Sequence, residues 1–143
     1  MDESAVASPS LASGRRRASS VLAAVGVAVV ITLVVEVLVG YDLRSPAMSG
    51  NPPIDIGAGT VAVVAALVGL AAWALASILE PRVARPRRIW TTVAAVVLAV
   101  SLFGPFSGPA ATADRLILTA LHLVVGAILI VAFRPSLPES RTR

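Results

Sequence analysis

Four long segments with almost no charged residues limit what this chain can fold into. Glu36 is the one charged residue well inside them, and they span residues 18–40, 56–79, 89–103 and 114–133. About 20 apolar residues in a helix cross a hydrocarbon core about 30 Å thick. A helix of a soluble bundle would carry polar residues on its outer half, and these segments do not. The sequence therefore predicts an all-α fold, a bundle of four transmembrane helices.

The composition excludes several kinds of active site. Of 143 residues, 57% are apolar and 14% are charged, a balance that soluble domains of this size rarely show. The chain has no cysteine and a single histidine, His122. A disulfide, a thiolate nucleophile and a zinc site built from Cys and His residues are therefore excluded. Because no catalytic motif is recognisable either, we expect a protein that is not an enzyme and that holds no metal and no cofactor.

The distribution of arginines predicts the orientation in the membrane. Three arginines lie at 15–17, four within 80–88 and three within 134–143, whereas the other two connections hold only Arg44 and Arg115. Positive charge favours the cytoplasmic side of a membrane, so both termini are expected in the cytoplasm. The arginines flank apolar segments and form no stripe on a soluble face, so binding of nucleic acid is not expected.

The two ends of the chain are predicted to lie outside the membrane domain. Residues 1–17 are mostly small, polar or basic, and residues 134–143 are mostly Pro, Ser and Arg. Segments with so few apolar side chains cannot bury a core and are typically disordered. We expect a disordered basic N-terminal tail, a membrane domain over residues 18–133 and a disordered C-terminal tail.

Two ionisable residues lie at similar depths in different helices. At a rise of about 1.5 Å per residue, Glu36 lies about 6 Å inside the outer end of the first helix and His122 about 9 Å inside that of the fourth. A charged residue at the centre of a membrane helix costs about 2.5–3.5 kcal/mol. A hydrogen bond between carboxylate and imidazole would offset part of that cost. We therefore predict that the two residues meet in a polar pocket in the outer half of the membrane.

Four hydroxyl groups belong to the same predicted pocket. Two of them stand three or four residues before an ionisable residue, on the same helix face, and two lie at this depth on the other helices. The candidate ligand-binding or proton-binding residues are Glu36, His122, Thr32, Thr60, Ser101 and Thr119. Two alternatives stay open: the carboxylate extends alone to the outer interface, and the imidazole bonds to a backbone carbonyl.

The connection before the third segment holds a second candidate site. Its sequence, EPRVARPRR, is rich in arginine over residues 80–88. An arginine near an anionic membrane surface contributes about 1 kcal/mol of attraction, in addition to its effect on topology. The candidate contacts with anionic lipid are Arg82, Arg85, Arg87 and Arg88.

Small residues predict where the helices approach closely. In the second segment Ala65 stands four residues before Gly69, and Ala72 stands four residues before Ala76. In the fourth segment Gly126 offers the same opportunity. Small residues at this spacing allow membrane helices to pack tightly, so we expect helix contacts at these positions.

Several short motifs resemble a known family. ARPRRIW opens the third helix, SLFGP closes it, and the fourth helix carries a single histidine. Over residues 18–134 the chain resembles a family of small uncharacterised four-helix integral membrane proteins of high-GC Gram-positive bacteria. The most specific residues are Arg88, Trp90, Ser101, Pro105 and His122. The resemblance implies a multi-pass protein of the bacterial plasma membrane and assigns no activity.

These observations lead to two functional hypotheses. The first is a non-enzymatic small subunit, regulator or binder of an apolar or lipid-like ligand, with its polar pocket in the outer leaflet. Its expected partners are the lipid bilayer together with an apolar small molecule, another membrane protein or a second copy of the chain. The alternative is a small transporter or proton-coupled carrier in which Glu36 and His122 exchange protons, since ionisable residues inside membranes often form relays.

Overall fold

The computed structural model describes residues 9–46, 52 and 54–140 of the chain. This part contains four α-helices, α1 (Pro9–Leu33), α2 (Ala58–Arg82), α3 (Pro86–Ser101) and α4 (Thr112–Phe133). Among the described residues there is one isolated β-bridge and no strand. The stretches that are long and apolar enough to cross a membrane are Ser13–Leu38, Ala58–Arg82, Pro86–Phe106 and Thr112–Ser136. The prediction of an all-helical chain with four candidate membrane spans is thus confirmed.

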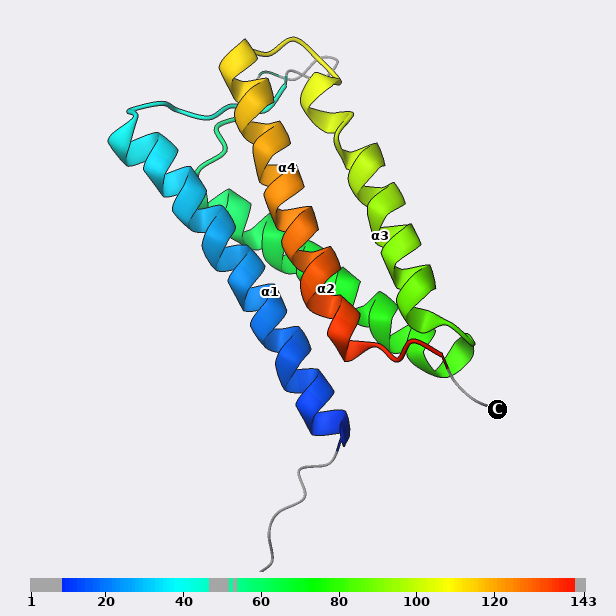
Figure 1. Ribbon diagram of the computed structural model, residues 1–143. Helices are drawn as coiled ribbons and strands as arrows, with labels where there is room; N and C mark the ends of the chain where they lie inside the picture. Colours follow the sequence, from blue (N-terminus) through cyan, green and yellow to red (C-terminus); the bar gives the residue numbers. More distant parts are fainter. Residues whose placement is uncertain (1–8, 47–51, 53, 141–143) are drawn as a thin grey trace, which may run out of the picture.

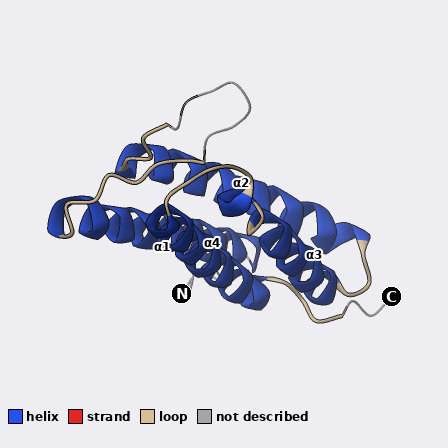
Figure 2. Cartoon of the chain, turned by 90° about the horizontal axis from the view of Figure 1, so that it is seen from above, coloured by secondary structure: helices blue, strands red, loops and turns tan. Residues whose placement is uncertain are grey.

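The helices run alternately up and down (Figure 1). Each helix packs against two neighbours, in the order α1, α2, α3, α4 around the bundle, as the view from above in Figure 2 shows. One end, here called the basic end, holds Arg17, the turn at residues 83–85 and Arg134. The opposite end, the distal end, holds residues 102–111 and the described part of the connection between α1 and α2, residues 39–46, 52 and 54–57.

The outer surface of the bundle is apolar along the helices. Large apolar side chains are exposed on each of them, for example Leu22 at 71%, Leu70 at 55%, Val97 at 58% and Leu116 at 64%. Of the most apolar 18-residue stretch within Pro86–Phe106, which includes α3, only 11% is buried inside the structure. A soluble monomer rarely exposes so much contiguous apolar surface. This surface is suited to contact with lipid.

The interior consists of two apolar clusters, one towards each end. Towards the basic end, Trp90 of α3 stacks on Phe133 of α4 with ring centroids 5.3 Å apart. The remaining buried members of this cluster are Val21, Ala24, Ala76, Leu129 and Leu137. The second cluster contains Ala28, Leu43, Ala65, Leu118 and Leu121. Both clusters draw residues from helices far apart in the sequence, so they hold the bundle together.

Glycines allow the closest helix contacts. A Cβ atom on Gly69 would lie 2.6 Å from Cγ1 of Val21, and a Cβ atom on Gly126 would lie 2.6 Å from Cδ1 of Leu98. Both distances are shorter than van der Waals contact. The predicted close approach is therefore confirmed at Gly69, between α1 and α2, and at Gly126, between α3 and α4.

The structure describes parts of the two segments that were predicted as tails. Helix α1 begins at Pro9, so residues 9–17 are helical. After α4 the chain makes a 3-10 turn over Arg134–Ser136, and Leu137 is then buried at 4% exposure. Composition does not show the contacts that these segments make with each other, such as the bonds of Arg17 to Ser136. Residues 1–8 and 141–143 of the predicted tails lie outside the described residues.

Helix α1 does not end as a regular α-helix. Residues Val34–Leu38 form a π-helix, in which the Val39 N–H bonds to the Val34 carbonyl at 3.2 Å. Gly40 follows with a φ of 67°, a left-handed conformation that glycine adopts without a steric penalty. The widened turn contains Glu36 and was not predicted from the sequence.

Candidate functional site

A buried arginine joins three segments at the basic end. Arg17 is 4% exposed and forms an ion pair with Glu80 of α2, with Nη2 and Oε2 2.7 Å apart. Its Nη1 donates to the Ser77 hydroxyl at 3.1 Å. Its Nε and Nη2 donate to the Ser136 hydroxyl and carbonyl at 3.2 and 3.1 Å. A guanidinium without these partners would be costly to bury, so the network explains why the segment after α4 is ordered.

The periodicity of α1 determines which of the three adjacent arginines turns inward. Arg17, Val21, Ala24 and Ala28 are all buried and follow one another at spacings of three or four residues, which is one face of a helix. Arg15 and Arg16 lie outside that face and are exposed. The sequence contains this signal, but it can be recognised only if the helix is extended back through the basic tail.

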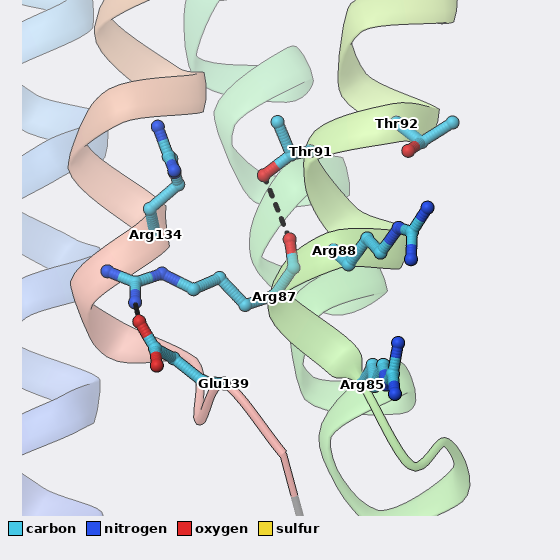
Figure 3. Close-up of a pocket in the computed structure, with 7 residues that line it drawn as sticks. All are labelled: Arg85, Arg87, Arg88, Thr91, Thr92, Arg134 and Glu139. Carbon is cyan, nitrogen blue, oxygen red and sulfur yellow. Dashed lines mark hydrogen bonds and ion pairs between the residues drawn. The ribbon is translucent and has the colours of Figure 1, made fainter.

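An open cavity of about 370 Å³ lies at the same end, beside the start of α3 (Figure 3). It is bordered by the beginning of α3 and by the residues that follow α4. Its lining residues are Arg85, Arg87, Arg88, Thr91, Thr92, Arg134 and Glu139. Four arginines and one carboxylate thus border the cavity.

Arg87 is the most enclosed of these arginines. Its side chain is 29% exposed and pairs with Glu139, which is 80% exposed. Its Nε is buried and has no hydrogen-bond partner among the described residues. Arg85, Arg88 and Arg134 are exposed, and in the described part of the chain none of them pairs with a carboxylate. Figure 3 shows Arg87 reaching towards Glu139 below Arg134, whereas Arg85 and Arg88 lie on the other side of α3.

The start of α3 adds backbone donors to the cavity. The helix begins at Pro86, which has no N–H, and no side chain caps its first turn. The first amide of this helix with a backbone acceptor is that of Ile89, which bonds to the Arg85 carbonyl at 3.2 Å. The amides of Arg87 and Arg88 therefore stay available, and a helix N-terminus favours an anion.

The predicted lipid contacts are only partly brought together. Arg85, Arg87 and Arg88 line the cavity, but Arg82 lies at the end of α2 and donates to its own helix, from Nη1 to the Ile78 carbonyl at 3.3 Å. Arg134 was not predicted as a member of the site. This membership was predictable, because two neighbouring antiparallel helices place the start of one beside the end of the other.

The distal end is organised around Asp114 of α4. This carboxylate is 5% exposed and accepts the N–H of Arg44 at 3.1 Å, from Nα to Oδ1. Arg44 in turn pairs with Asp55, its Nε 3.2 Å from Oδ1, across an antiparallel bridge. Desolvation, followed by the side-chain hydrogen bond to Asp114, raises the pKa of Tyr41 above its ordinary value. The connection between α1 and α2 is therefore held against the start of α4.

The predicted contact between Glu36 and His122 is not formed. The carboxylate of Glu36 lies beside Gly57 at the start of α2, with Oε1 3.5 Å from the place that a Cβ on this glycine would take. Nδ1 of His122 lies 2.7 Å from the Leu118 carbonyl of its own helix. Because a carbonyl only accepts, Nδ1 donates in this bond. The depths of the two residues were inferred from sequence, but their directions around the helix axes were not.

The four predicted hydroxyls make no hydrogen bond to Glu36 or His122 in the described part of the chain. Thr32 donates to the Ala28 carbonyl at 3.0 Å and Ser101 to the Leu98 carbonyl at 2.7 Å. A helix offers these carbonyls locally, so the hydroxyls need no partner on another helix. Thr60 is exposed, and the buried Thr119 hydroxyl has no partner among the described residues.

Comparison with known proteins finds a protein family. The model of a family of unknown function, DUF6069, matches residues 9–139. No curated protein and no solved structure matches the chain. The matched region begins where α1 begins. It includes Arg17 and the residues that line the cavity at the basic end. The expected likeness to an uncharacterised family is confirmed to this extent.

Proposed function

The chain belongs to the DUF6069 family of unknown function, and we propose that it is a non-enzymatic integral membrane protein that binds anionic lipid through its basic end. Both termini lie on the cytoplasmic side of a bacterial plasma membrane in this proposal. A protein of this kind acts as a small subunit or regulator, responding to the lipid around it and contacting a membrane partner.

One observation carries the proposal: the arginine-lined cavity lies where two candidate membrane spans end. One span begins at Pro86 and the other ends at Ser136, and the cavity is lined by residues within about one turn and a half of these positions. This is the level of lipid headgroups if the two spans cross the bilayer. An anionic leaflet attracts basic side chains at that level by about 1 kcal/mol each.

The alternative functions have weaker support from the geometry. A proton-coupled carrier would use Glu36 and His122 in one relay, but the carboxylate lies against Gly57 and the imidazole bonds to Leu118. A pocket for an apolar ligand in the outer half of the membrane would need the same residues to converge. The charged side chains that line one cavity lie at the basic end.

Lipid dependence can be tested with purified protein in nanodiscs. We expect a higher unfolding temperature in phosphatidylcholine mixed with phosphatidylglycerol than in phosphatidylcholine alone, because a bound anion stabilises only the folded state. Equal unfolding temperatures in the two lipids would contradict the proposed function. The two nanodisc preparations need the same acyl chains, so that bilayer thickness does not differ.

Orientation can be tested separately, because the chain has no native cysteine. Single substitutions Ser140→Cys at the basic end and Ser107→Cys at the distal end place thiols at exposed positions. In intact cells an impermeant maleimide should label Ser107→Cys and spare Ser140→Cys until the membrane is opened. The reverse pattern would contradict the cytoplasmic position of the termini.

A further inference from the structure

We propose that the arginine-lined cavity at the basic end is a binding site for a phosphomonoester group. Glu139 occupies part of this cavity when no phosphate is bound. The inference deepens the proposed function, because it rests on the position of the cavity at the membrane surface. It names the chemistry that the cavity recognises. A lipid headgroup or a soluble phosphate could supply that group, and the experiment distinguishes the two.

Charge is the first argument. Four arginines and one carboxylate line the cavity. The carboxylate pairs with Arg87, and Arg85, Arg88 and Arg134 have no carboxylate partner among the described residues. A phosphomonoester carries about −1.5 to −2 charges near pH 7, whereas a phosphodiester carries about −1. The planar guanidinium donates pairs of hydrogen bonds that match phosphate oxygens. A monoester therefore neutralises more of this cavity than a diester does.

The available donors are the second argument. The first-turn amides of Arg87 and Arg88 have no acceptor in the described part of the chain, and the helix lacks a side-chain cap. The buried Nε of Arg87 also lacks a partner. A buried donor without an acceptor is uncommon in folded proteins. An oxyanion at the start of α3 would supply acceptors to these groups together.

The ion pair of Arg87 with Glu139 provides a reversible occupant. Ser136 and Leu137 are buried, and Ser136 is bonded to Arg17, so the chain just before Glu139 is held in place. Glu139 itself is 80% exposed, and exposed ion pairs contribute only about 0–1 kcal/mol. Figure 3 shows its carboxylate at the Arg87 guanidinium, at the edge of the cavity. A phosphate can therefore displace it at small cost.

The test compares phosphatidic acid, a monoester, with phosphatidylglycerol, a diester, in phosphatidylcholine nanodiscs of equal surface charge. Binding is followed through the unfolding temperature and, in detergent, by native mass spectrometry. We expect phosphatidic acid to stabilise the wild-type protein more. The double variant Arg88→Gln/Arg134→Gln should lose this preference and bind phosphatidic acid at least about tenfold more weakly, because the loss of a single charge-assisted hydrogen bond already has an effect of this size.

The matched control is Arg15→Gln/Arg16→Gln, which removes the same charge from exposed residues at the same end but outside the cavity. The control should keep the preference for phosphatidic acid. Equal losses in both double variants, with wild type still favouring anionic lipid over phosphatidylcholine, would overturn the site and leave the proposed function standing. No preference for any anionic lipid would overturn both.

Two further measurements complete the test. Inorganic phosphate added to the protein in phosphatidylcholine nanodiscs should leave the unfolding temperature unchanged if the ligand is a lipid. A phosphate effect that disappears in Arg88→Gln/Arg134→Gln would support the same site with a soluble ligand. Glu139→Gln removes the competing carboxylate and should tighten phosphatidic acid binding several-fold, whereas weaker binding in this variant would overturn the role of Glu139.

Discussion

At the basic end a single side chain, Arg17, bonds to α2 and to the segment after α4, whereas at the distal end the connection between α1 and α2 also has bonds between backbone groups. There the Ile56 N–H bonds to the Leu43 carbonyl at 2.7 Å and the Ser45 N–H to the Ile54 carbonyl at 2.9 Å. The basic end is thus held by the bonds of a few side chains, and the described part of the distal connection is held by backbone bonds as well as by side chains.

This difference has consequences for substitution. Backbone hydrogen bonds are present with almost any side chain, so most changes in the distal connection should be tolerated. The buried guanidinium needs its particular partners, because an unpaired buried charge is costly. Asp114 is the exception at the distal end, since its carboxylate accepts a backbone N–H across elements.

The largest effect is expected for Glu80→Gln. The variant leaves the Arg17 guanidinium, 4% exposed, without its carboxylate. We expect the free energy of unfolding to fall by about 2–3 kcal/mol. This is at or below the low end of the range for fully buried ion pairs, because Glu80 is 37% exposed. SDS titration in mixed micelles, followed by tryptophan fluorescence, measures it. Glu139→Gln breaks the other Arg–Glu pair of this end and should cost less than about 1 kcal/mol. If Glu80→Gln and Glu139→Gln lower the free energy of unfolding equally, burial of the arginine does not determine how much an ion pair contributes to stability.

Asp114→Ala tests the side-chain contact of the distal end. It removes the acceptor of the Arg44 N–H and the partner of Tyr41, and we expect a loss of about 1.5–2 kcal/mol in the same titration. Asp42→Ala is the control, because Asp42 is exposed in the same connection and should change stability by less than about 0.5 kcal/mol. A negligible effect of Asp114→Ala would mean that backbone bonds alone hold this end.

Gly69→Ala probes the middle of the bundle, between the two ends. The new Cβ would meet Val21, whose branched side chain has little freedom, at 2.6 Å from Cγ1 and 3.3 Å from Cβ. Overpacking costs about 1–3 kcal/mol and alanine regains about 1 kcal/mol of helix propensity, so the net loss should be about 1 kcal/mol. Gly26→Ala has nothing within 4 Å of its Cβ and should be neutral or stabilising. The same micelle titration measures the change in unfolding free energy for both variants. Equal changes in Gly69→Ala and Gly26→Ala would contradict close packing at Gly69.

The smallest effect concerns the pKa of Tyr41, which is the only tyrosine. Its raised pKa means that the folded state favours the neutral phenol. The associated stabilisation is present below the ordinary pKa of about 10 and is lost as the pH rises through the higher folded value. Absorbance of the phenolate should therefore show a midpoint above about 10, and Asp114→Asn should lower it. An unchanged midpoint in the variant would exclude Asp114 as a cause.

Parts of this structure follow from local sequence alone. The four candidate spans were predicted because the transfer of an apolar helix into lipid depends on its own composition. The close contacts at Gly69 and Gly126 were predicted because a missing side chain permits them wherever the partner lies. Three of the four cavity arginines were recognised as a cluster because they are adjacent in the chain.

Other parts needed the tertiary structure. Depth along a helix follows from residue count, but the direction of a side chain depends on the rotation of the helix, which the packing of all four helices sets. This is why Glu36 and His122 share a depth without meeting. For the same reason, only Arg17 of three consecutive arginines is buried. The sequence by itself determined how many apolar helices the chain forms and where its positive charge gathers. Only the tertiary structure decided which charges meet, because contacts between distant residues depend on the positions of whole helices.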